Sequence, residues 1–141
     1  SASFALRQLV QGNILALDNE QLTIGLNEDG IPIKRFGLDL LADHEYSLGM
    51  INNAARLLLS GPIKGVRGDN RLALVERWVK DLTDEQNKQL FESAIEMAMV
   101  RKDWFSAQKI LRLQIKLDSY KSLDIKRLEL KLDRIIREVE K

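Results

Sequence analysis

The sequence contains no cysteine and a single histidine, His44, among its 141 residues. The lack of cysteine excludes a disulfide framework, a thiolate nucleophile and every zinc site built on sulfur ligands. It is compatible with a cytoplasmic or other intracellular location, where disulfides are rare. A single imidazole leaves little scope for histidine-based proton transfer or metal binding. These absences remove many classes of enzyme, and we predict no metal and no other cofactor.

Long apolar runs and low-complexity segments are missing as well. No run of 18 apolar residues occurs, so we predict no membrane span, and the first residues lack the basic and apolar regions of a signal peptide. We interpret Ser1-Ala2-Ser3 as a cloning remnant or as the start of an excised or processed piece. The composition, 45% hydrophobic and 30% charged with two prolines, is that of a globular protein. The length predicts a single domain over residues 1–141.

The charge is divided unevenly along the chain. Residues 1–100 hold ten Lys or Arg against fourteen Asp or Glu, a net charge of −4, whereas residues 101–141 hold twelve against seven, a net charge of +5. A basic C-terminal third attracts acidic protein surfaces and phosphate backbones alike. The charge therefore favours a macromolecular partner without choosing between protein and nucleic acid.

Alternating apolar residues near the N-terminus predict a small antiparallel sheet. Leu22, Ile24 and Leu26 alternate with smaller or polar residues, at the period of a half-buried strand. The residues 27–30 that follow predict a four-residue loop with a positive φ at Gly30, after which the alternation resumes. Together with an apolar run at 14–17 and a turn at 18–20, this pattern predicts a three-stranded β-meander over about residues 13–36.

From about residue 38 onward the apolar residues recur at helical spacing, which predicts a bundle of about five helices over residues 38–141. The fold class is thus mainly α (α+β). Ser47 is the predicted N-cap of a helix that ends before Gly61-Pro62. Asp69 or Asn70 is the predicted N-cap of the next helix, and a mobile basic loop is predicted at residues 60–71 between the two. Further start signals are a capping box from Thr83 to Gln86, and Asp103.

The last helix carries the strongest functional signal. Its apolar residues follow the spacings 3, 4, 3, 4, which is the a/d seam of a coiled coil over two heptads. The seam consists of Ile125, Leu128, Leu132, Ile135 and Val139. Three further apolar residues, Leu123, Leu130 and Ile136, add apolar surface beyond this seam. Two interpretations stay open, because the seam either packs into the chain's own bundle or meets a second chain.

These features predict a non-enzymatic interaction or scaffold module that binds a partner protein, or a copy of itself, through the seam. The alternative is a nucleic-acid-binding accessory protein, whose phosphate contacts come from basic side chains in two places. These are Lys64, Arg67 and Arg71 in the basic loop and Arg127, Lys131 and Arg134 in the last helix. No small-molecule substrate is evident.

The densest cluster of titratable residues is Asp39, Asp43, His44 and Glu45. Asp39 and Asp43 have the i, i+4 spacing that places two carboxylates on one helix face, but a metal would need further ligands. We therefore interpret Asp43 as the cap of a helix that begins near Glu45. No nucleophile, base and acid are grouped in the sequence, so we predict that the chain is not an enzyme.

Overall fold

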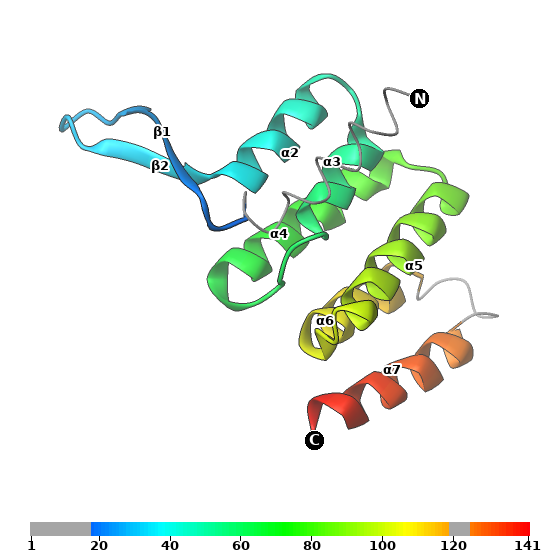
Figure 1. Cartoon of the computed structure of the whole chain (residues 1–141). Helices are drawn as coiled ribbons and strands as arrows, with labels where there is room; N and C mark the ends of the chain where they lie inside the picture. The colour runs from blue at the N-terminus through cyan, green and yellow to red at the C-terminus, as the bar shows by residue number, and fades with distance from the viewer. Residues whose placement is uncertain (1–17, 119–124) are drawn as a thin grey trace, which may run out of the picture. The chain divides into compact units, whose positions relative to one another are not determined.

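The computed structural model describes residues 18–118 and 125–141, and these residues are mostly helical (Figure 1). The elements are β1 (Gln21–Leu26), β2 (Pro32–Phe36), α2 (Gly37–Ser47), α3 (Ile51–Leu58), α4 (Gly65–Trp78), the short 3-10 helix η1 (Val79–Asp81), α5 (Asp84–Val100), α6 (Trp104–Asp118) and α7 (Ile125–Val139). The predicted class, mainly helical with a small antiparallel sheet near the N-terminus, is confirmed.

The chain divides into two compact units between Gly61 and Pro62. The first contains β1, β2, α2 and α3, and the second contains α4, η1, α5, α6 and α7. The single domain expected over residues 1–141 stays a prediction. Among the described helices, none is long and apolar enough to cross a membrane.

The sheet of the first unit is an antiparallel hairpin of β1 and β2. Its loop has the predicted form: Gly30 adopts φ 77°, and the Asn27 side chain accepts backbone N–H groups from Asp29 at 2.9 Å and Ile31 at 3.0 Å. The remaining strand of the predicted three-stranded meander, the first along the chain at residues 13–17, lies outside the described residues. Asp18 and Asn19 have helical backbone where we predict a turn, since both residue types occur as readily at helix ends as in turns.

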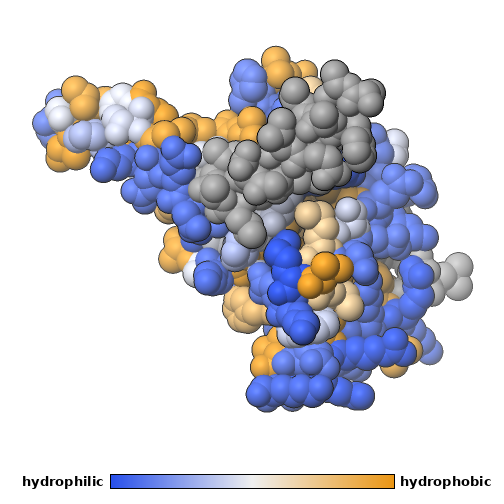
Figure 2. All heavy atoms as spheres, in the orientation of Figure 1, coloured by the Kyte–Doolittle hydropathy of each residue, from blue (hydrophilic) through white to orange (hydrophobic). Residues whose placement is uncertain are grey.

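The hairpin departs from the prediction in its exposure. Every residue of β1 is exposed, and Leu26 reaches 65%. The space-filling view accordingly shows apolar atoms on the surface of the hairpin, at the left (Figure 2). The prediction of a half-buried strand is therefore wrong, because alternation in the sequence gives a strand an apolar face but does not supply a layer to cover it.

Two predicted helix caps in the first unit are wrong. α2 begins at Gly37, which places Asp43 inside the helix rather than at its start, and α3 begins at Ile51 with Met50 at its N-cap. Ser47 is instead the last residue of α2, where its hydroxyl donates to the carbonyl of His44 at 2.6 Å. The chain turns after α2 because Gly49 adopts φ 80°.

The predicted loop at 60–71 is wrong, since α4 begins at Gly65 and only a short segment precedes it. The glycines in this stretch have structural roles. Gly65 adopts φ 66°, and a Cβ added at Gly68 would lie 2.7 Å from the carbonyl carbon of Ile63. Gly68 thus permits the chain before α4 to pass closely over the first turns of the helix. The predicted caps Asp69 and Asn70 lie inside α4.

The core of the second unit takes residues from all four of its α-helices. Trp78 of α4 and Phe91 of α5 are both buried, and the α5 residues Leu90 and Ile95 are fully buried. α5 begins with the predicted capping box: the Thr83 hydroxyl accepts the N–H of Gln86 at 3.1 Å, and the Gln86 side chain accepts the N–H of Thr83 at 2.9 Å.

Candidate functional site

The structure divides the predicted seam of α7 between buried and accessible residues. α7 packs against α6, which in turn packs against α5. Leu128 and Ile135 are buried at 4% and 1% exposure, Ile125 and Leu132 are half-buried, and Val139 is 38% exposed. Leu128 and Ile135 therefore belong to the chain's own core, and the exposed apolar surface of α7 includes Leu130, outside the seam.

That accessible surface is a groove of about 430 Å³ beside α7. Met99 at the end of α5 and Trp104 at the start of α6 line it from the helical corner. α7 supplies the remaining lining residues, Arg127, Leu130, Lys131, Arg134, Ile135 and Glu138. Leu130 is 62% exposed, which leaves it available for contact.

The cations of the groove form one stripe along α7. Arg127, Lys131 and Arg134 follow the i, i+4, i+7 spacing of a single helix face, and Glu138 continues the same face. The Arg127 guanidinium lies 3.9 Å from the Glu92 carboxylate, with both side chains largely exposed. Glu92 therefore offsets part of the positive charge of Arg127, and the positive potential of the stripe depends mainly on Lys131 and Arg134.

The corner between α5 and α6 positions Met99 and Trp104. The backbone N–H of Asp103 donates to the carbonyl of Ala98, and that of Lys102, at φ 60°, donates to Met99. These two bonds close α5 with the Schellman arrangement, in which Lys102 occupies a position that usually holds glycine. The corner is therefore held by backbone bonds rather than left as a loose loop.

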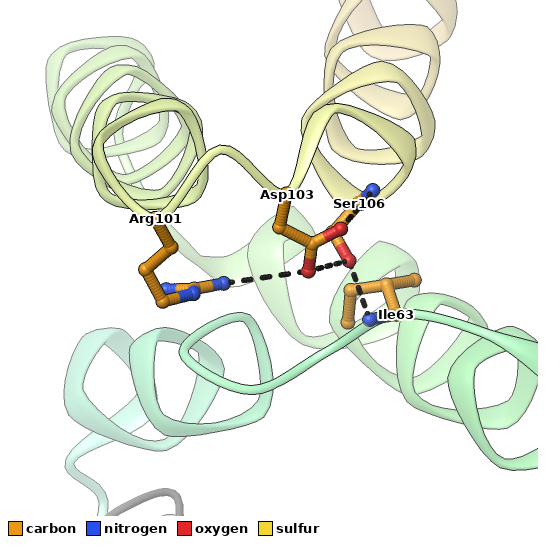
Figure 3. A network of polar contacts seen from close by, with 4 residues as sticks. All are labelled: Ile63, Arg101, Asp103 and Ser106. Carbon is orange, nitrogen blue, oxygen red and sulfur yellow. Dashed lines mark hydrogen bonds and ion pairs between the residues drawn. The ribbon is translucent and has the colours of Figure 1, made fainter. Parts of the chain in front are cut away.

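Asp103 starts α6 as predicted, and it also ties a distant segment to the corner (Figure 3). Its carboxylate accepts the Ser106 backbone N–H at 3.1 Å and the Ser106 hydroxyl at 2.6 Å. The buried Ser106 hydroxyl oxygen in turn accepts the backbone N–H of Ile63 at 2.8 Å. Arg101 lies 3.8 Å from the same carboxylate. The network satisfies buried backbone groups, which is the role of a helix cap.

Replacing Ser106 by alanine should lower the free energy of unfolding by about 1–2 kcal/mol, because the buried N–H of Ile63 would lose its acceptor. Urea denaturation measures this change. Ser93→Ala, at a half-buried position of α5, is the matched control and should stay within about 0.5 kcal/mol of the parent chain. Equal stability of the two variants would contradict a structural role for the Ser106 hydroxyl.

The three basic residues that were predicted to bind nucleic acid from the loop at 60–71 do not form one exposed surface. Arg71 is 1% exposed on α4, which leaves its guanidinium no accessible surface for a phosphate. Lys64 is exposed at the N-cap of α4, and Arg67 is half-buried in the first turn. Sequence reasoning placed all three in a flexible loop, and the early start of α4 is the reason for the difference.

A second groove, of about 370 Å³, lies between α4 and α6, but its charges are largely paired. Lys109 is 2.8 Å from Asp69, and Lys116 is 2.7 Å from Glu76. Such paired charges give little net potential for a ligand of either sign. The groove beside α7 is consequently the stronger candidate.

The acidic cluster of the first unit has a structural explanation in part. Asp43 forms an ion pair with Arg35 of β2 at 2.9 Å, and His44 is exposed near the end of α2. Within residues 18–118 and 125–141, no three His, Asp or Glu side chains are grouped as a metal site requires.

Sequence reasoning missed two members of the groove, Met99 and Trp104. Met99 lies before the corner at Asp103 and Trp104 lies after it. Only the packing of α7 beside that corner brings these two residues near Arg134. Leu130 is one of the apolar residues predicted to lie outside the seam, but nothing in the sequence distinguishes it from Leu123 and Ile136. The chain matches no protein-family model, and comparison with curated proteins and with solved structures gives no match either.

Proposed function

We propose that this chain is a non-enzymatic protein-interaction module that binds a partner through the groove beside α7. One observation carries the proposal, namely the exposed Leu130 beside an apolar groove with a basic rim. Large exposed apolar residues rimmed by polar ones are typical of protein-binding surfaces. The intracellular location inferred from the lack of cysteine belongs to the same proposal.

The non-enzymatic part of the proposal rests on the chemistry of the groove. Its ionisable residues are three cations and Glu138, and none is paired with a nucleophile. The nearest arrangement to a catalytic one, Asp103 with Ser106, is a helix cap whose hydroxyl already accepts the Ile63 N–H. Ser106 is also only 1% exposed, so its hydroxyl offers no surface at which it could attack a substrate.

A nucleic-acid role has less support than a protein partner. Glu138 and Glu92 repel phosphates and ligand carboxylates alike, so the charges do not separate the two partners. The apolar lining by Met99 and Leu130 favours a protein partner, because a phosphate backbone makes no use of it. The buried Arg71 removes one of the three cations on which the second basic site depended.

A photo-crosslinking experiment tests the proposal. p-Benzoylphenylalanine replaces Leu130 in one variant and Val66, which is 77% exposed on α4, in a matched control. In a nuclease-treated lysate, we expect discrete protein adducts at position 130 and none of them at position 66. An adduct between two copies would identify self-association as the form of the interaction.

Two outcomes would overturn the proposal. Equal labelling at both positions would mean that the groove has no preference for a partner. Adducts that disappear on nuclease treatment would instead favour the nucleic-acid alternative. Circular dichroism of both variants checks that α7 remains folded.

A further inference from the structure

The groove beside α7 combines two chemistries that a ligand must match at once. Its accessible apolar residues, Met99, Trp104 and Leu130, stand beside a line of cations on α7. A ligand that buries apolar side chains against the first set brings its own flanking residues against the second. The complementary ligand is therefore amphipathic, with an apolar face and an acidic flank.

The length of the groove favours a helix as that ligand. The lining residues of α7 run from Arg127 to Glu138, a rise of about 16 Å at 1.5 Å per residue, or about three helical turns. An extended peptide gains affinity by adding to a sheet edge, and α5, α6 and α7 offer no strand to this groove. A helix satisfies its own backbone groups and needs only side-chain contacts.

The charged residues of the groove determine which charge the flank of the ligand carries. Arg127, Lys131 and Arg134 face the groove with one carboxylate, Glu138, on the same stripe, and Glu92 offsets Arg127 in part. The rim thus keeps an excess of positive charge, and carboxylates on the ligand are the groups that complement it. A second copy of α7 related by a two-fold axis parallel to the helix would place each cation opposite its own copy, which disfavours that form of self-association.

We propose that the groove binds an acidic amphipathic helix of another protein. The apolar face of that helix packs on Trp104 and Leu130, and its carboxylates pair with Lys131 and Arg134. This inference rests on the function proposed above, and adds the chemical class and the conformation of the partner.

The test is a selection from a displayed library of helix-favouring peptides of about 18 residues, long enough to fold in part on their own. Positions i, i+3, i+4, i+7 and i+11 vary among Leu, Ile, Phe and Trp, and the others among Glu, Lys, Gln and Ala, so that the starting library has no mean charge. The full chain is the bait. We expect the enriched peptides to carry a net negative charge with glutamates along one flank of the apolar face.

Two double variants distinguish the effect of the groove cations Lys131 and Arg134 on binding from the effect of net charge alone. Lys131→Glu with Arg134→Glu alters the groove, and Lys126→Glu with Arg137→Glu changes the net charge equally at exposed α7 positions outside it. The first pair should weaken the best peptide about tenfold, and the second less than about twofold. Raising the salt concentration should weaken the binding of the parent chain more than that of the rim variant.

The outcomes distinguish this inference from the function on which it rests. Enrichment of neutral or basic peptides that depend on Leu130, shown by loss with Leu130→Gln, would overturn the acidic helix while keeping the interaction site. No enrichment of any peptide over the Leu130→Gln chain would overturn both. Binding of a labelled mixed-sequence single-stranded oligonucleotide, lost in the rim variant, would overturn both in favour of nucleic acid.

Discussion

Replacing Gly68 by alanine should lower the free energy of unfolding by about 2–3 kcal/mol, although alanine is the better helix former by about 1 kcal/mol. The added Cβ would lie 2.7 Å from the carbonyl carbon of Ile63 and 3.1 Å from its Cα. These are backbone atoms, which cannot rotate aside as the end of a flexible side chain can. The Ile63 N–H is also fixed by its bond to Ser106, so either the helix or this segment must shift.

Urea denaturation of Gly68→Ala beside Asn70→Ala makes the measurement. Asn70 is exposed two residues further along α4, where alanine removes no close contact and improves helix propensity. Its variant should therefore match or slightly exceed the parent stability. A Gly68→Ala chain as stable as Asn70→Ala would show that the segment at residues 62–64 yields without cost.

Gly68 also shows why part of the fold could not be predicted. In a sequence, glycine indicates a flexible turn, a positive φ or a close approach of two backbones, and nothing local separates these meanings. Gly65 has the second role and Gly68 the third. Interpreting both glycines as signs of flexibility led to the prediction of a mobile loop where α4 begins. It also led to the prediction of an exposed Arg71, which is in fact buried.

The predictable elements are those whose signal is local. The Thr83 to Gln86 capping box and the Asp103 cap depend on residues three apart, and both form as predicted. The loop from Asn27 to Gly30 is a further local signal that the structure confirms. In contrast, burial of the hairpin depends on a covering layer, which no pattern within its own residues can report.

The candidate site falls between these cases. Helical spacing alone aligns Arg127, Lys131 and Arg134, so the basic stripe follows from the sequence. The apolar part does not, because Met99 and Trp104 reach the groove through the Schellman corner and the packing of α7. The same packing decides which side of α7 is accessible, and a wide apolar stripe is ambiguous on that point.

Two aspartate substitutions on opposite sides of α7 should have very different effects on the free energy of unfolding. Ile135→Asp should lower the free energy of unfolding by about 3–5 kcal/mol, because the side chain is 1% exposed and a carboxylate there would be buried without a partner. Leu130→Asp should change it by less than about 0.5 kcal/mol, since Leu130 is 62% exposed and a charge at that position stays in water.

Thermal melts of the two variants measure stability, and sedimentation measures association, so the two effects are separated. If α7 is a core helix with a free groove, Ile135→Asp melts at a lower temperature whatever the protein concentration, while Leu130→Asp keeps the parent melting temperature and loses its partner. If the seam is instead an interface between chains, Ile135→Asp yields a folded monomer from an associated parent. A folded, monomeric Ile135→Asp chain would therefore reject the assignment of Ile135 to the core and return the seam to the role of a binding surface.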